Sequence, residues 1–455
     1  MKYLLSLLGL LFIISCANQP EAATNSVINL AVTNSNAPNA MVRNSDGFSK
    51  EMSFSENGTL TDTLTLAKNG YYQLIVGRES TSIYLEKGKN ISVSLDGQMF
   101  DESLTYTGDL AAENNYLAAK YLFDEKFDFK EVYSKEEAQF LETIQKLHQG
   151  KLDLLTNAGI TNTDFVTKET NELTYDNASN LESYVDYHMY FTKKTAFTVT
   201  DNFYEPLASI NYADTSAFRN SNSYAGLLNV HYNRIAQKNS DEPDFNSTVA
   251  FLSAVNDGLP NGHAKEALMT NQLQFGLRPD EGLEAAYSIY KNSAPSAKNL
   301  ATVTARYEKL STITKGKTSP AFDYENFAGG KTSLSDLKGK YVYIDVWATW
   351  CGPCIREIPS LKILEADYHD ANIAFVSISI DEQKDYEKWR KMIPEKELGG
   401  IQLMANNAWK SEFITAYAIN GIPRFIVLDT EGNIVSADAP RPSDPKLRTL
   451  LDELI

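Results

Sequence analysis

The sequence predicts a chain of three parts: an N-terminal antiparallel β domain, a central α-helical region and a C-terminal α/β domain. Apolar residues alternate with a period of two in much of the first hundred residues, which is typical of half-buried strands. They recur every three or four residues through the middle of the chain, which is typical of helices packed on one face. From about residue 317, β-prone runs alternate with helical stretches, the order of an α/β layer fold. A length of 455 residues fits about three domains.

The start of the chain has the pattern of an export signal. The basic residue Lys2 precedes an apolar run from Leu4 to Ile14, which is shorter than the roughly 20 residues of a membrane-spanning helix. The run ends in Ile-Ile-Ser-Cys, which resembles a bacterial lipobox. This resemblance implies a signal peptide of residues 1–15 and a lipid on Cys16. The alternative is an ordinary signal peptide that happens to contain a cysteine.

The residue after Cys16 indicates the membrane to which a lipoprotein is delivered. Ala17 stands where an Asp would retain a lipoprotein at the inner membrane, so the pattern resembles an outer-membrane address. We therefore expect a protein of the cell envelope that faces the periplasm and is attached to the membrane by its lipid. Residues 16–24 are expected to be a linker between the anchor and the folded chain.

The composition argues against a nucleic-acid partner. The chain has 42 Lys and Arg against 59 Asp and Glu, a formal net charge of −17. A surface of this sign repels phosphate. Only three cysteines are present, although an exported compartment permits disulfides. Cys351 and Cys354 therefore pair with each other or with something else.

Residues 25–108 are predicted to form a small antiparallel sandwich. The segments 70–77 and 89–95 have the composition of strands, and Asn-Gly pairs at 57–58 and 69–70 indicate tight turns. Residues 109–315 are predicted to be helical, without a fixed repeat period. Within this region, His148 and His188 lie on or beside apolar faces, so we expect these two to be packing or interface residues rather than metal ligands.

Residues 317–455 are predicted to form the α/β domain. Buried strands are expected at 341–347, 373–380, 424–429 and 433–438, and helices at about 353–368, 383–393, 408–418 and 444–454. The first strand leads directly into the segment WATWCGPC, which holds two of the three cysteines.

A lone Cys-x-x-Cys pair is compatible with half a zinc site, a passive disulfide or a redox dithiol. Zinc requires about four ligands. There is no second Cys-x-x-Cys, and His369 stands alone, so we expect neither a metal nor a cofactor. The neighbouring residues favour the redox dithiol.

The position of the cysteine pair favours redox chemistry, because it opens a predicted helix just after a buried strand. The free N–H groups and the positive end of the helix dipole stabilise a thiolate on the first cysteine. Pro353 suits the first helical turn, where no N–H is required. We therefore expect Cys351 to be the exposed nucleophile and Cys354 the buried resolving thiol.

Residues from about 318 to 455 resemble the thioredoxin fold of TlpA/ResA-like thiol–disulfide oxidoreductases. The similarity runs through SPAFDYENFAGGKTSLSDLKGKYVYIDVWATWCGPCIREIP. The matching positions are Trp350, Cys351, Gly352, Pro353 and Cys354 in the motif, Asp345 at a buried aspartate, Glu357 at an active-site glutamate, Pro359 at a helix-kinking proline, and Ile422 with Pro423 at a cis-proline. The resemblance implies that Pro423 faces the dithiol and receives the substrate backbone. It also implies that residues 383–404 form an inserted helix and strand.

The residues themselves support roles for two acids. Asp345 interrupts an apolar strand, and burial of a carboxylate raises its pKa. Glu357 lies three residues after Cys354, on the same side of the helix. Either acid could accept the proton of Cys354. The alternatives are a strand-edge position for Asp345 and a solvated helix surface for Glu357.

The resemblance implies a thiol–disulfide oxidoreductase acting on protein thiols or disulfides. The Gly-Pro between the cysteines resembles reducing thioredoxins, so we expect a reductase supplied by a membrane thiol electron carrier. One alternative is a disulfide oxidase or isomerase with the same dithiol. Another is a ligand-binding lipoprotein in which residues 25–315 act and the redox domain is accessory. A thiol peroxidase would require a Pro-x-x-x-Thr-x-x-Cys pattern, which the sequence lacks.

Overall fold

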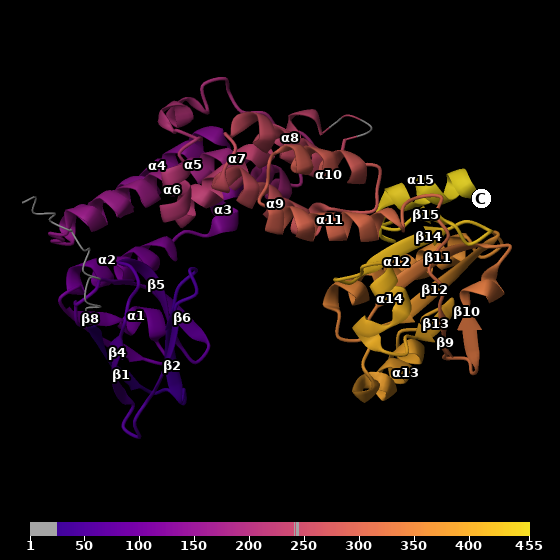
Figure 1. Ribbon diagram of the computed structural model, residues 1–455, viewed down its shortest axis with the longest axis horizontal. Helices are drawn as coiled ribbons and strands as arrows, with labels where there is room; N and C mark the ends of the chain where they lie inside the picture. Colours follow the sequence, from indigo (N-terminus) through magenta and orange to yellow (C-terminus); the bar gives the residue numbers. More distant parts are fainter. Residues whose placement is uncertain (1–24, 241, 243–244) are drawn as a thin grey trace, which may run out of the picture. The chain divides into compact units, whose positions relative to one another are not determined.

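The structure is a computed structural model that describes residues 25–455 except 241 and 243–244 (Figure 1). The chain divides into two compact units, residues 1–208 and 209–455, and each is described here by itself. The predicted signal peptide, Cys16 and the linker lie outside the described residues. The division at residue 208 distributes the helices of the predicted 109–315 region between the two units.

Two four-stranded sheets begin the first unit, in the orders β4-β1-β7-β8 and β3-β2-β5-β6. Buried side chains of both sheets, such as Leu30 and Leu74, belong to one hydrophobic core. The strands are β1 Ser26–Thr33, β2 Asn39–Arg43, β3 Ser49–Ser53, β4 Thr59–Leu64, β5 Gly70–Val76, β6 Glu79–Leu85, β7 Ile91–Asp96 and β8 Thr105–Gly108. These strands include the predicted segments 70–77 and 89–95.

The expectation that this domain is wholly antiparallel is wrong for one pair of strands. β1 and β7 run parallel, with Ile28 opposite Ile91 and Leu30 opposite Val93. Parallel neighbours require a long connection. Here the intervening chain provides it, because five other strands lie between β1 and β7 in the sequence.

Helices complete the first unit and pack on the sandwich. They are α1 Phe100–Ser103, α2 Ala111–Asp124, α3 Phe129–Ser134, α4 Glu137–Asn157 and α5 Thr163–Thr192. Glu169 of α5 is buried and accepts hydrogen bonds from the hydroxyls of Tyr71 and Tyr116 and from the Lys120 ammonium. A buried carboxylate is stable only when it is paired in this way, so Glu169 links α5 to β5 and α2. His188 is fully buried, with Nδ1 3.0 Å from a backbone oxygen, and is a packed histidine as expected.

The second unit begins with a series of helices that pack on one another. They are α6 Thr215–Asn220, α7 Asn222–Ala236, α8 Ser247–Gly258, α9 His263–Gly276, α10 Leu283–Asn292 and α11 Ala297–Ser311. The Asn-Gly at 261–262 separates α8 from α9, and Pro295 separates α10 from α11, in agreement with the expected breaks.

The α/β domain contains a seven-stranded sheet in the order β10-β9-β13-β12-β11-β14-β15 (Figure 1). An interior strand, β11, pairs in parallel with β12 and antiparallel with β14. Side chains of α12 and α15 share a core with Tyr343 and Phe425 of the sheet. The strands are β9 Asp323–Asn326, β10 Lys331–Ser333, β11 Tyr341–Trp347, β12 Ile373–Ser379, β13 Ile401–Met404, β14 Arg424–Leu428 and β15 Ile434–Ser436; the helices are α12 Gly352–Asp367, α13 Tyr386–Glu395, α14 Glu412–Ala416 and α15 Pro445–Leu454.

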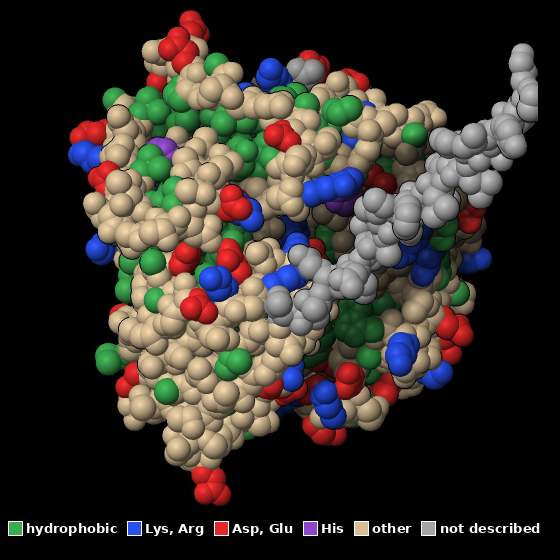
Figure 2. Space-filling model, turned by 60° about the vertical axis from the view of Figure 1, so that its left-hand side comes forward, with side chains coloured by type: hydrophobic (Ala, Val, Ile, Leu, Met, Phe, Trp, Pro, Cys, Tyr) green, Lys and Arg blue, Asp and Glu red, His purple; other side chains and the backbone are tan. Residues whose placement is uncertain are grey.

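The sequence did not identify the two short strands β9 and β10, because four and three residues are too few for a clear periodic pattern. The expected insertion at 383–404 is present as α13 and β13. Within the described part of the chain, no helix combines the length and apolar character needed to cross a bilayer. Acidic and basic side chains are interspersed over the face of the molecule shown in Figure 2.

Candidate active site

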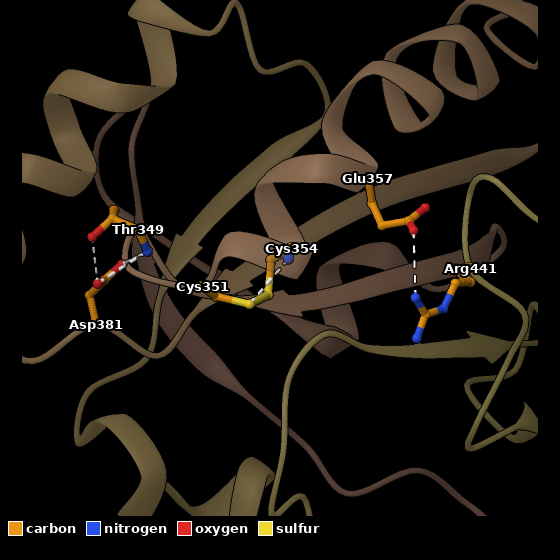
Figure 3. Close-up of a disulfide and its surroundings, with 6 residues drawn as sticks. All are labelled: Thr349, Cys351, Cys354, Glu357, Asp381 and Arg441. Atoms are coloured by element: carbon orange, nitrogen blue, oxygen red, sulfur yellow. Dashed lines mark hydrogen bonds and ion pairs between the residues drawn. A yellow bond between two sulfur atoms is a disulfide. The ribbon is translucent and has the colours of Figure 1, made fainter. Parts of the chain in front are cut away.

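The turn from β11 into α12 carries the cysteine pair (Figure 3). Cys351 is the N-cap of α12, and its sulfur accepts the backbone N–H of Cys354 at 3.2 Å. The two sulfurs form a disulfide, with the Cα atoms 5.3 Å apart. Pro353 occupies the first turn of the helix, where the sequence placed it.

The expected difference in exposure between the cysteines is absent. Cys351 and Cys354 are each 4% exposed. The expectation of an exposed Cys351 is therefore wrong for the disulfide form, because the bond draws the first sulfur onto the helix against the second. Their positions still differ, since Cys351 caps the helix and Cys354 lies within its first turn.

A buried carboxylate that sequence reasoning missed holds the loop before the dithiol. Asp381 is 2% exposed and accepts the Thr349 backbone N–H at 3.2 and 2.9 Å and the Thr349 hydroxyl at 2.8 Å (Figure 3). The Ser379 hydroxyl donates a further bond to Asp381 at 2.7 Å. Because Thr349 lies two residues before Cys351, these bonds position the loop that presents the dithiol. Asp381 directly follows a predicted strand, but no sequence signal pointed to Thr349 as its partner.

Tryptophan borders the dithiol on its solvent side. Trp350 is 50% exposed, although it directly precedes a buried cysteine. Its ring centre lies 6.4 Å from that of Trp409, which follows β13. Together, the exposed ring of Trp350 and the half-buried ring of Trp409 offer apolar contact to an extended substrate chain.

Asp345 lies in the middle of the sheet, between Ser377 of β12 and Phe425 of β14. The strand-edge alternative is therefore wrong. Its Oδ1 is buried and has no hydrogen bond within the described residues. Burial raises the pKa of Asp345 to about 8, and the charges of Glu357 and Glu365 add to the shift. At neutral pH this carboxyl is mainly protonated and is able to exchange a proton.

Glu357 is 9% exposed, so the solvated-surface alternative is also wrong. Its carboxylate accepts the backbone N–H and the hydroxyl of Ser443, each at 3.0 Å. Figure 3 shows it directed toward Arg441, whose Nη1 lies 3.8 Å away, rather than toward the disulfide. The structure therefore links Glu357 to the segment before α15 and, through its charge, to Asp345. A direct exchange of protons with Cys354 stays a prediction.

Glu365, six residues beyond Pro359 in α12, is an acid that the sequence did not single out. Burial raises the pKa of Glu365 to about 7. Its carboxylate lies against Gly399 and Gly400, where a Cβ would meet it at 2.3 and 2.9 Å. Gly400 also has a φ of +58°, so both its backbone and its surroundings favour glycine. Pro359 lies inside α12, as expected.

The peptide bond between Ile422 and Pro423 is cis, which confirms the prediction made from the resemblance. The next residue, Arg424, begins β14 opposite Val346 of β11. Because β11 ends one residue later and leads to Cys351, the antiparallel pairing places Pro423 and the dithiol at the same edge of the sheet.

Comparisons with known proteins agree with this geometry. The family model of the AhpC/TSA family matches residues 315–437. Residues 315–437 form a thioredoxin-like domain of the AhpC/TSA family. Thioredoxin-like protein YneN of Bacillus subtilis is 38% identical over 76 residues, which are 17% of this chain and 44% of that protein. Thiol-disulfide oxidoreductase ResA of Bacillus cereus is 28% identical over 120 residues, 26% of this chain and 66% of ResA.

A solved structure, a thiol-disulfide oxidoreductase from Bacteroides fragilis, is 30% identical to the thioredoxin-like domain. It covers 30% of this chain and 100% of its own, with a TM-score of 0.28. The resemblance to ResA-like proteins and the enzyme class, a thiol–disulfide oxidoreductase, are confirmed for the thioredoxin-like domain. The chain spans 44% and 66% of the two curated relatives, so what the whole protein does is treated below as a proposal.

The described residues contain no group of three or more His, Cys, Asp or Glu side chains arranged to hold a metal ion. The chemical groups that the thioredoxin-like domain brings together are the two cysteines, the protonated Asp345 and the two tryptophans. This set is suited to exchange between thiols and disulfides.

Asp345→Asn should remove a component of the pH dependence of stability. The pKa of Asp345 is about 8 in the folded protein and 3.8 as its ordinary value, so the folded state holds the extra proton between these limits. The carboxyl therefore favours the folded state at low pH. Its contribution to the free energy of unfolding falls by about 1.4 kcal/mol per pH unit as pH rises toward 8. Asparagine cannot ionise, so the variant should lack this slope.

The measurement is denaturant unfolding of the oxidised protein at pH 5, 6, 7 and 8, followed by tryptophan fluorescence. All four tryptophans lie between residues 347 and 409, so the signal reports the thioredoxin-like domain. Asp323→Asn changes an exposed carboxylate of the same domain and is the matched control. Parallel pH curves for wild type and Asp345→Asn would contradict the assignment.

Proposed function

We propose that this protein reduces protein disulfides in the cell envelope through the Cys351–Cys354 dithiol. The observation that carries the proposal is the placement of the cysteine pair at the N-terminus of α12, at the same sheet edge as the cis-proline Pro423. The first feature favours a thiolate nucleophile. The second suits an extended substrate chain, because the family resemblance implies that Pro423 receives the substrate backbone beside the dithiol.

The reaction begins from the reduced protein. The Cys351 thiolate attacks one sulfur of the substrate disulfide, which forms a mixed disulfide and releases the other substrate sulfur as a thiolate that takes up a proton. Cys354 then loses its proton and attacks the Cys351 sulfur. The second substrate sulfur leaves and is protonated, while the Cys351–Cys354 disulfide forms. Two electrons pass from the dithiol to the substrate, while Cys354 gives up one proton and the solvent supplies the other.

The backbone and the buried acid assist separate steps. The Cys354 N–H, 3.2 Å from the Cys351 sulfur, and the helix terminus stabilise the attacking thiolate. Asp345, with its pKa raised to about 8 by burial, is available near neutral pH to exchange the proton of Cys354, directly or through water. Thr349 and Asp381 hold the loop in place, so both are positioning residues.

The direction of electron flow follows from the residues between the cysteines. Gly352 and Pro353 resemble those of reducing thioredoxins, whose potential is about −270 mV, whereas a strong oxidant of the DsbA type has about −120 mV. We expect a midpoint potential closer to the first value. Equilibration in thiol–disulfide buffers with detection by tryptophan fluorescence measures it. A value near −120 mV would support a disulfide oxidase instead.

A reductase outside the cytoplasm must be reduced again after each cycle. We propose that a membrane thiol electron carrier supplies the two electrons by the reverse exchange at Cys351. Protein thiols and disulfides are then the partners on the substrate side.

Cys354→Ala should trap the proteins that this dithiol serves. Cys351 still attacks, because its thiolate depends on the helix terminus rather than on Cys354, but the mixed disulfide lacks its resolving thiol. A non-reducing gel of the variant from its own cell envelope, followed by mass spectrometry, should show adducts that a reductant releases. Cys351→Ser is the control and should show none. A Cys354→Ala protein with free, reactive Cys351 and no adduct would count against thiol–disulfide exchange.

We further propose that a lipid on Cys16 anchors the protein in the outer membrane, where the protein faces the periplasm. The proposal rests on the sequence Ile-Ile-Ser-Cys at the end of the apolar run. Several acyl chains on one residue would anchor it stably. Labelled palmitate should enter wild-type protein and not Cys16→Ser. Equal labelling of the two proteins would contradict the lipid anchor.

A further inference from the structure

Arg356 lies beside the dithiol, and Arg441 lies beside Glu357, which points away from the disulfide (Figure 3). The Arg356 guanidinium is 3.7 Å from the position that a Cβ on Gly352, between the two cysteines, would occupy. Arg356 is exposed and has no ion pair or hydrogen bond within the described part of the chain. Arg441 is 3.8 Å from Glu357, which already accepts two hydrogen bonds from Ser443, and 58% of its side chain is exposed (Figure 3).

A second pair of arginines flanks the cis-proline. Arg424 directly follows Pro423, and its Nη1 lies 2.5 Å from Oδ1 of Asp438. Arg278, between α9 and α10, places its Nη1 2.6 Å from Oδ2 of the same carboxylate. The helical segment thus contributes a charged side chain next to the residue that follows Pro423.

Positive charge exceeds its local compensation on the proline side. Burial lowers the pKa of Arg306 of α11, and the nearby charge of Arg424 lowers it further. Within the described residues, Nε of Arg306 is buried without a hydrogen bond. The acids facing these three arginines are Asp438 and Asp280. Each guanidinium has five N–H donors, so several remain for a ligand.

We infer that the arginines beside the dithiol and beside the cis-proline select protein disulfides flanked by acidic side chains. The inference rests on the proposed function, because it names the substrate class of the same dithiol. Arginine and carboxylate form charge-assisted, often bidentate hydrogen bonds, which orient as well as attract. The net charge of −17 opposes an acidic partner at long range. Beyond about 10 Å that repulsion is screened in ordinary buffer, so the local arginines decide the contact.

The test uses three peptides of about ten residues that share one intramolecular disulfide and differ only in two flanking residues, which are Glu, Gln or Lys. Reduced full-chain protein is mixed with each peptide, and oxidation of the dithiol is followed by the fluorescence of Trp350 and Trp409. Such a single turnover needs no electron donor. At about 0.1 M ionic strength, where the long-range repulsion is screened, the second-order rate constant should be about tenfold higher for the Glu peptide than for the Lys peptide. The two should converge toward about 1 M salt.

Variants separate recognition from structure. Arg356→Gln and Arg278→Gln should each lower the Glu-over-Lys preference about threefold, as expected for single exposed charges, with little effect on the Gln peptide. Arg356→Glu should shift the preference toward the Lys peptide, which a merely structural role of Arg356 would not produce. Lys331→Gln, on the edge strand β10, removes an exposed cation at the far end of the sheet order and should leave the preference unchanged.

The outcomes distinguish the two proposals. Equal rate constants for the Glu and Lys peptides at about 0.1 M salt, with both peptides reduced, would overturn the acidic preference and leave the reductase intact. A preference that survives in both Arg356→Gln and Arg278→Gln would overturn the assignment to these arginines. If no peptide is reduced while iodoacetamide still alkylates Cys351, the proposed function fails and the inference fails with it.

Discussion

The pairing of β11 on both of its edges is the constraint on which the candidate site depends. Parallel bonding to β12 and antiparallel bonding to β14 hold β11 in the interior of the sheet. The strand then ends at Trp347, and α12 begins at Gly352, so the cysteine pair stands at a defined end of the sheet. The antiparallel direction of β14 brings Pro423 to that same end. One strand thus positions the nucleophile, the cis-proline and the buried Asp345.

Carboxylates beneath this edge differ because their surroundings differ. Within the described residues, Oδ1 of Asp345 is buried without a hydrogen bond, and burial raises the pKa of Asp345 to about 8. Asp381 is 2% exposed, but it accepts bonds from Thr349 and Ser379. Burial of a carboxyl without hydrogen bonds favours the neutral acid. One acid is therefore suited to proton exchange and the other to holding a loop.

The helical segment of the second unit contributes to the same region of the thioredoxin-like domain. Arg278 and Arg424 share the carboxylate of Asp438, although they come from a helix connection and from the start of a strand. Breaking a shared pair would leave a partly buried charge without its partner, which is costly. The contact therefore stabilises the packing of the helices beside the cis-proline. It also brings a charged side chain into the part of the site that an extended substrate chain would approach.

Local sequence patterns were sufficient for the strands β5, β7, β11 and β12, for the helix that the cysteines open, and for the close approach of the two cysteines. Periodicity and spacing act over a few residues, so they can be read directly. The resemblance to ResA-like proteins added the cis-proline and the role of Asp345 as a buried acid. It could not supply the exposure of Cys351, because burial depends on how the disulfide packs against the helix.

The features that only the tertiary structure decided join residues far apart in the chain. The bonds from Thr349 to Asp381 span 32 residues, those from Ser443 to Glu357 span 86, and the contact between Arg278 and Asp438 spans 160. The parallel pairing of β1 with β7 is of the same kind. The sequence by itself determined which segments form strands and helices and which two cysteines pair. Which distant side chains meet was decided by the packing of the sheet, because a side chain's charge and polarity do not specify its partner.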